Sequence, residues 1–151
     1  MKKNLLYRWF GIGAIPKKIR PVLDSEGILA ADEGMGGWFI AKNVKGPGKR
    51  YVRRREGFIG CLAITRKRIV CYSFGKRQMH VAVDDPAISN IYADHPEQDT
   101  LTVSFDGGRF RTGWQGILEF RFKTDQAAPL YQALTAAGVR PGRADAADTH
   151  T

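Results

Sequence analysis

The chain of 151 residues has few of the residues that mark catalytic, metal-binding or disulfide-stabilised proteins, with two cysteines and three histidines. Two cysteines without CxxC spacing do not form a zinc site. Three scattered histidines give no Ser/His/Asp or Cys/His constellation. Gly36-Gly37 is not followed by Gly-Lys-Ser/Thr, so it does not form a phosphate-binding loop. We therefore expect a protein that is not an enzyme and that uses no metal or cofactor.

Long apolar runs are also missing. No run approaches the ~18 apolar residues of a membrane-spanning helix. The first ten residues, MKKNLLYRWF, are interrupted by charge and are followed by no small-residue cleavage site, unlike a signal peptide. We expect a cytoplasmic protein, free in solution or held peripherally at the inner face of the membrane.

Acidic residues are scarce in the first half of the chain. Residues 1–77 hold 18 Lys/Arg and 5 Asp/Glu, whereas residues 78–151 hold 6 and 10. The total formal charge is +9. Such a chain should favour anionic partners, which include phospholipid headgroups, nucleic acid and acidic protein surfaces.

Residues 56–85 are predicted to form three consecutive β-strands, at Phe58–Ile64, Ile69–Phe74 and Gln78–Val83. A two-residue turn at Arg66-Lys67 would pair Ile64 with Ile69, Leu62 with Cys71 and Cys61 with Tyr72. The two cysteines then lie on opposite faces and cannot form a disulfide with each other. Both faces of this hairpin are apolar. We expect one face to form the core and the other to be covered by a helix, the N-terminal arm or a second subunit.

The flanking segments predict further strands. Ile28–Ala31 is a short strand, 32–37 a flexible turn, Trp38–Val44 a strand and Ala87–Ala93 another, followed by a polar connection over 94–99. Segments 101–105 and 118–122 alternate between apolar and polar residues. Their apolar side chains should face inward and Thr102, Ser104, Glu119 and Arg121 should face water.

One helix is predicted over 125–137. Thr124 or Asp125 would cap it and Gly138 would end it. Its apolar stripe consists of Ala127, Leu130, Tyr131, Leu134 and Ala137. The small polar residues that follow predict a disordered tail over 139–151.

Residues 1–24 form a basic, aromatic arm. Its charged and aromatic residues include Lys2, Lys3, Arg8, Trp9 and Phe10. One interpretation is a membrane-facing anchor with the aromatic rings at headgroup level. The other is that the arm packs on the open apolar face of the hairpin.

A second basic segment carries seven cations without an acid: Lys42, Lys45, Lys49, Arg50, Arg53, Arg54 and Arg55. The Gly-Pro-Gly at 46–48 predicts that this segment is a loop. Arginine guanidinium groups suit phosphate oxygens, so the segment is our candidate anion-binding site. Alternatively, it is a solvated loop or one paired with the acidic second half of the chain.

Three motifs carry a resemblance to a known family: Ser-Glu-Gly-Ile-Leu at 25–29, Gly-Cys-Leu-Ala-Ile-Thr-Arg-Lys-Arg-Ile-Val at 60–70 and Trp-Gln-Gly-Ile-Leu-Glu-Phe-Arg-Phe at 114–122. Together with the final helix they resemble the bacterial pleckstrin-homology-like (PH-like) and GRAM-type domains over residues 25–138. The resemblance implies a mainly β fold, an antiparallel barrel or roll of about seven strands capped by one C-terminal helix. It also implies a non-catalytic domain that binds lipids, peptides or its own copies.

Phosphoinositide-binding members of that superfold use basic residues in the first strand-to-strand loop. Lys45 or Lys49, followed by Arg53 and Arg55, fits this pattern. The segment 28–57 is longer than a plain first hairpin, however, so the acidic, glycine-rich 32–37 is the alternative first loop.

We therefore predict a binding module that docks on an anionic surface, either membrane phospholipid or an acidic protein. The alternative is a self-associating scaffold domain that uses the apolar outer face of 58–83. Nucleic-acid binding is disfavoured because no helix concentrates the charge. An enzyme would have to use Asp94, His95, Glu97 and Asp99 on one loop.

Overall fold

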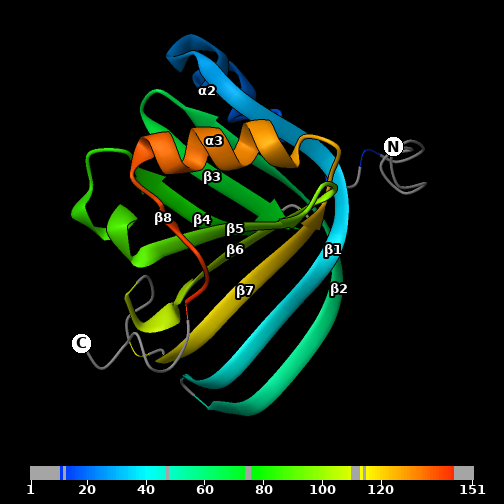
Figure 1. Cartoon of the computed structure of the whole chain (residues 1–151), viewed down its shortest axis with the longest axis vertical. Helices are drawn as coiled ribbons and strands as arrows, with labels where there is room; N and C mark the ends of the chain where they lie inside the picture. Colours follow the sequence, from blue (N-terminus) through cyan, green and yellow to red (C-terminus); the bar gives the residue numbers. More distant parts are fainter. Residues whose placement is uncertain are drawn as a thin grey trace.

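A single curled sheet organises the protein, as the computed structural model shows for residues 11, 13–46, 48–73, 76–109, 113 and 115–144 (Figure 1). The strands are β1 (Ile28–Gly46), β2 (Lys49–Thr65), β3 (Arg68–Ser73), β4 (Lys76–Ala82), β5 (Ile91–Glu97), β6 (Thr100–Asp106), β7 (Gln115–Lys123) and β8 (Arg140–Pro141). Their order in the sheet is β4-β3-β2-β1-β7-β6-β5-β8. Neighbours are antiparallel except β8, which adds two residues parallel to β5.

The helices are α2 (Arg20–Glu26) and α3 (Ala127–Ala137), with short 3₁₀ turns η1 (Pro86–Asn90) and η2 (Gly107–Arg109). The sheet forms a half-barrel, and α3 lies across its concave side (Figure 1). The prediction of a mainly β, barrel-like antiparallel fold followed by one C-terminal helix is confirmed. None of the helices described is long and apolar enough to cross a membrane.

The main core lies between α3 and the concave face of the sheet. Leu130 and Leu134 of α3 are fully buried there, as predicted. Phe120 of β7 stands at the centre of an aromatic cluster, with ring centroids 5.0 Å from Phe39 and 5.8 Å from Phe58. Burial of one such leucine contributes about 1.5–3 kcal/mol.

The two ends of α3 differ in how well the sequence predicts them. Gly138 ends the helix in the left-handed conformation, with φ +115°, as predicted. The N-cap is Gln126, not Thr124 or Asp125, and no side chain caps it. The Thr124 hydroxyl instead accepts a hydrogen bond from the Gln126 amide at 2.9 Å and donates one to Asp32 Oδ2 at 2.6 Å. Thr124 thus joins the start of α3 to β1.

The β2–β3 hairpin has the predicted register, with Ile64 opposite Ile69 and Cys61 opposite Tyr72. Its inner face joins the main core. Its outer face forms a second core, in which Ile15 and Leu23 cover Cys61, Ala63 and Val70. The cover therefore comes from the same chain, so this apolar face no longer argues for a second subunit.

The two free cysteines sit in different cores, on opposite sides of the hairpin. Burial raises the pKa of the Cys61 thiol to about 12. Burial also raises the pKa of Cys71. Both thiols are therefore protonated and shielded at neutral pH, as expected for small buried side chains.

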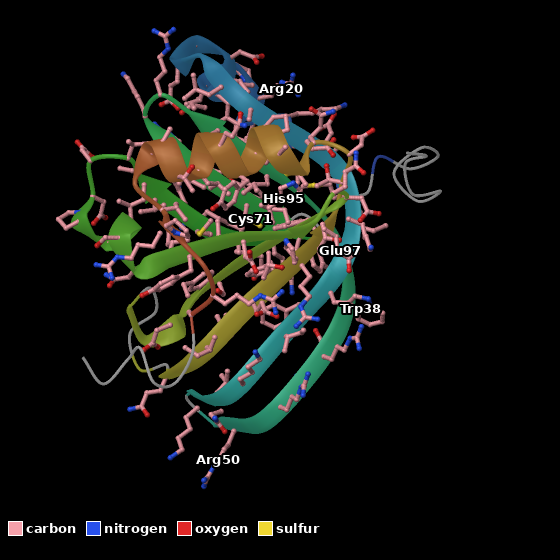
Figure 2. The ribbon with its side chains drawn as sticks, viewed as in Figure 1. Arg20, Trp38, Arg50, Cys71, His95 and Glu97 are labelled. Carbon is pink, nitrogen blue, oxygen red and sulfur yellow. The ribbon has the colours of Figure 1, made fainter. Side chains whose placement is uncertain are left out.

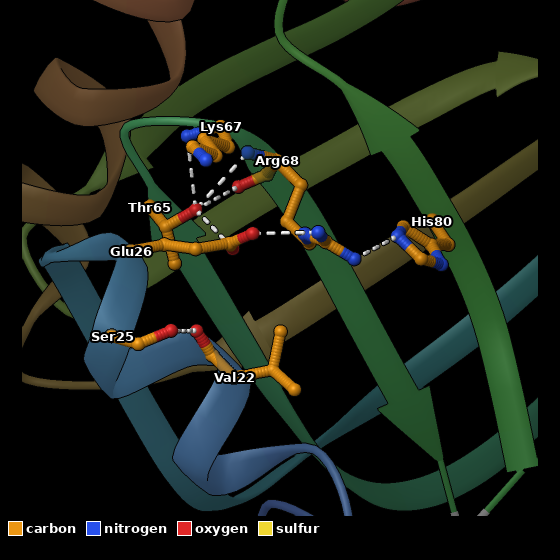
Figure 3. A network of polar contacts seen from close by, with 7 residues as sticks. All are labelled: Val22, Ser25, Glu26, Thr65, Lys67, Arg68 and His80. Atoms are coloured by element: carbon orange, nitrogen blue, oxygen red, sulfur yellow. Dashed lines mark hydrogen bonds and ion pairs between the residues drawn. The ribbon is translucent and has the colours of Figure 1, made fainter.

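Helix α2 is fastened to the β2–β3 turn by polar contacts (Figure 3). Glu26 accepts hydrogen bonds from Arg68 Nη2 at 2.6 Å and from the Thr65 hydroxyl at 3.1 Å. The Thr65 hydroxyl also accepts from the amides of Lys67 at 3.1 Å and Arg68 at 3.0 Å. His80 Nε2 lies 3.2 Å from Arg68 Nη1.

These contacts shift two pKa values. Burial raises the pKa of Glu26, but the hydrogen bonds from Arg68 and Thr65 and the nearby positive charges outweigh burial, so the net pKa is lowered. The pKa of His80 is also lowered, by burial first and then by the charges of Arg68 and Arg77.

The predicted turn at 32–37 is wrong, because β1 runs without interruption from Ile28 to Gly46. A register shift between Asp32 and Met35 shows a β-bulge at this position. Glu33 has a partner there, since its Oε2 accepts from the Ile15 amide at 2.8 Å. Gly37 has no room for a side chain, because a Cβ would collide with the Arg121 carbonyl of β7. The acidic, glycine-rich composition therefore reflects a bulge and a close strand approach, not the first loop.

Two other predictions need correction. The strand expected over 87–93 is the 3₁₀ turn η1 followed by β5, since Pro86 starts a turn that the Asp85 side chain caps. Strand β5 then continues through 94–97, which was expected to be a polar connection. Pattern alone could not separate a 3₁₀ turn of small apolar residues from a strand.

The outer face of β6 and β7 is not open to water as predicted. Thr102, Ser104 and Glu119 point away from α3 but are each 0% exposed. Alternation identified the two faces correctly, but it carries no information about what covers them.

The ordered chain also differs from the expected limits at both ends. Residues 20–26, where the arm was expected to end and no helix was predicted, form α2. At the other end, residues 140–144 of the expected tail have defined contacts, including the β8–β5 pairing. Ile15 and Leu23 of the expected arm do pack on the outer face of the hairpin. Lys2, Lys3, Arg8, Trp9 and Phe10, and with them the membrane-facing interpretation, lie outside the described residues.

Candidate functional site

The candidate site is built on the hairpin of β1 and β2, the two longest strands of the sheet. Pairing continues to its tip, where Lys45 lies opposite Arg50 and Gly46 opposite Lys49. The loop predicted over 45–55 is therefore wrong, since most of it belongs to β2. It also follows that the first strand-to-strand connection lies at the basic tip. Figure 2 shows Arg50 at the end of the hairpin, away from the helices.

Alternation along β2 divides the predicted basic cluster between two faces. Arg53 lies opposite Lys42, and Arg55 lies opposite Ile40. These residues share the outer, convex face of the sheet. Arg54 points to the other face, where it forms an ion pair with Glu56.

An exposed tryptophan lies on the outer face beside these cations. Trp38 is 45% exposed, one of three large hydrophobic residues described as exposed. The guanidinium carbon of Arg55 lies 4.1 Å from the centroid of the Trp38 ring. This cation–π contact orients Arg55 across the outer face, and the guanidinium group keeps its positive charge.

Strand β7 adds Arg121 on the other side of β1. Arg121 lies opposite Trp38, and Glu119 lies opposite Ile40. We name the set Trp38, Lys42, Arg53, Arg55 and Arg121 the outer basic face. Its four cations come from three adjacent strands, which the sheet holds at fixed spacing.

A buried carboxylate lies within the outer basic face. Glu119 Oε2 accepts from Arg121 Nε at 2.8 Å, and its Oε1 lies 3.9 Å from Lys42 Nζ. Among the residues that the structure describes, Oε1 has no hydrogen-bond partner, and neither does the buried Thr102 hydroxyl. Glu119 is fully buried, and a buried carboxylate is costly unless cations lie beside it, as Arg121 and Lys42 do here. One carboxylate against four cations leaves the face with a net positive charge.

The structure thus brings together three of the seven predicted cations, Lys42, Arg53 and Arg55. Lys45 and Arg50 are exposed near the tip, and the backbone of Lys49 lies at the tip itself. Arg54 is separated from them. Sequence reasoning missed Trp38 and Arg121 as members of the face. The outward position predicted for Arg121 was the available signal, but strand order was needed to place β7 beside β1.

The acidic residues considered for an enzyme have contacts of their own. Asp94 pairs with Arg143 at 3.1 Å, and His95 Nδ1 lies 3.1 Å from the Thr100 carbonyl oxygen. Across the described part of the chain, no three His, Cys, Asp or Glu side chains gather in a way that could hold a metal ion. In the described part of the chain, the groups with resolved pKa shifts are Glu26, His80 and the two cysteines, which all lie around the β2–β3 hairpin and not near Asp94 and His95.

No family matches. Neither a model of a known protein family nor a curated protein sequence is significantly similar to this chain. The function must therefore be argued from the outer basic face and the hairpin tip.

Proposed function

We propose that this protein is a non-catalytic binding module that docks on an anionic phospholipid surface, at the inner leaflet of the membrane. The observation that carries the proposal is the convergence of Lys42, Arg53 and Arg55 with Arg121 on one rigid face, beside the exposed Trp38. The exposed Lys45 and Arg50 extend this positive surface to the hairpin tip. The PH-like resemblance agrees with such a role.

The expected strength follows from the number of cations. Each basic side chain near an anionic leaflet contributes about 1 kcal/mol. Four to six such residues allow reversible attachment that weakens as salt screens the charges. Trp38 adds an amphipathic ring of the kind found at headgroup level. Tryptophan is also common in protein–protein interfaces, so the vesicle experiment below, and not the ring itself, separates lipid from the acidic-protein alternative.

Co-sedimentation with vesicles tests the proposal. We expect binding to vesicles of phosphatidylserine and phosphatidylcholine, none to phosphatidylcholine alone, and loss of binding as salt is raised. Arg55→Glu reverses a charge on the outer basic face and should cost about 2 kcal/mol, a factor of about 30 in the partition coefficient.

Arg54→Glu is the matched control. It makes the same charge change one residue away, on the opposite face, and should weaken binding far less. Circular dichroism would verify that both variants fold. Equal binding to both vesicle types, or equal losses for the two variants, would refute the proposal.

A further inference from the structure

The chain beyond β8 turns onto the outer face of the sheet. The Gly142 amide donates to the Ala93 carbonyl of β5 at 2.8 Å. Two residues later, the Ala144 amide donates to the Ser104 hydroxyl of β6 at 2.8 Å. Arg143, between them, pairs with Asp94 at 3.1 Å. Figure 1 shows this segment, in red, passing in front of the strands. Between Gly142 and Ala144 the chain thus crosses from the edge strand β5 to β6, the strand next to β7.

A row of cross-strand neighbours connects Ser104, which binds Ala144, with the outer basic face. Ser104 lies opposite Glu119, Glu119 opposite Ile40, and Ile40 opposite Arg55. Adjacent strands are ~4.8 Å apart, so β2 lies about 14 Å from β6 along the sheet. An extended chain advances ~3.3 Å per residue, so four residues beyond Ala144 span about 13 Å.

Charge complementarity identifies the occupant. The next acids in the sequence are Asp145 and Asp148, the only charged residues other than His150 in 145–151. Asp145 directly follows Ala144 and Asp148 is four residues beyond it, so the chain is long enough for two carboxylates to reach the cations of the outer basic face. Glu119 and Ile40 on this path are 0% and 1% exposed, although they face away from α3.

We propose that segment 145–151 docks on the outer basic face through Asp145 and Asp148, and so competes with anionic lipid for the same cations. The lipid part of this inference rests on the proposed function. A tethered competitor acts at a high effective concentration, so two carboxylates suffice to weaken binding to a sparse anionic surface. A densely charged surface displaces them. The segment thereby sets a threshold of anionic lipid density for docking.

The test uses Asp145→Asn/Asp148→Asn, which preserves chain length and shape. Asp24→Asn/Asp84→Asn is the control, because it removes two exposed acids from α2 and from the turn after β4, away from the outer basic face. At low salt and low phosphatidylserine content, the first pair should strengthen vesicle binding roughly threefold to tenfold. The control should change it much less.

A second measurement needs no lipid. The ¹⁵N amide shifts of Lys42, Arg55 and Arg121 should move in Asp145→Asn/Asp148→Asn and remain fixed in the control. Moved shifts without vesicle binding by any form would overturn the membrane function and leave the docking intact. Vesicle binding that is equal in all forms, with fixed shifts, would overturn the docking alone. Equal gains for both variant pairs would show a general charge effect and also overturn it.

Discussion

Helix α2 should detach from the sheet when Leu23 is shortened. Leu23 is 0% exposed and is the buried residue of α2, lying over Cys61, Ala63 and Val70. A helix of seven residues is not stable alone, so its position depends on this contact and on the Glu26–Arg68 pair. Leu23→Ala at a fully buried site costs about 3 kcal/mol, which increases the detached population about 100-fold.

The two cysteines report this detachment separately. Cys61 lies under α2, and Cys71 lies in the main core. Alkylation followed by peptide-resolved mass spectrometry should show Cys61 labelled about 100-fold faster in Leu23→Ala, with a rate that depends little on urea. Cys71 should be labelled more slowly than Cys61 and only through global unfolding, with a steep urea dependence. Equal labelling rates for both thiols in the variant, or a steep urea dependence for Cys61, would refute an independently detachable layer.

Three further perturbations test other parts of the structure. Acidification should lower the stability in two stages, because His80 and Glu26 both have folded pKa values below their unfolded ones. Protonation of His80 should destabilise the fold as the pH falls below about 6.5, and protonation of Glu26 should do so below about 4.5. Urea midpoints that stay constant between pH 7 and 5 would contradict the His80 stage. Gly37→Ala should cost about 1–3 kcal/mol in thermal unfolding, because the new Cβ meets the Arg121 carbonyl; a neutral change would show that β1 and β7 can separate there. Glu119→Gln should lower the melting temperature and strengthen vesicle binding, since it leaves Arg121 without its carboxylate; unchanged binding would exclude Glu119 from the electrostatics of the face.

The parts of the fold that the sequence predicted are those that depend on neighbouring residues. The Arg66-Lys67 turn, the inward side chains of 118–122 and the end of α3 at Gly138 follow from alternation and turn chemistry within about ten residues. The bulge at Asp32–Met35 could not be predicted in this way. Its acidic residues are held by Thr124 and the Ile15 amide, which are far away in the sequence.

The candidate site was predicted in composition but not in geometry. The density of Lys and Arg over 42–55 identified the hairpin that carries most of the candidate face. The same charges were expected on one loop, whereas strand pairing separates Arg54 from Arg53 and Arg55. Arg121 joins the face because β7 follows β1 in the sheet, although the two strands are far apart along the chain. Sheet order is a property of the whole chain and is not encoded in any single segment.

The double burial of the β2–β3 hairpin changes what specifies its register. When one face of a strand is buried and the other is wet, a slip of one residue places polar side chains in the core and is strongly penalised. Here a slip would exchange one apolar set for another, so the hydrophobic pattern penalises it little. The distinction between correct and slipped pairing therefore depends on the turn, where the single Thr65 hydroxyl accepts from two backbone amides. In this hairpin the choice of partner strand positions is encoded by a polar residue at the end of the strand, and the apolar residues supply stability without supplying alignment.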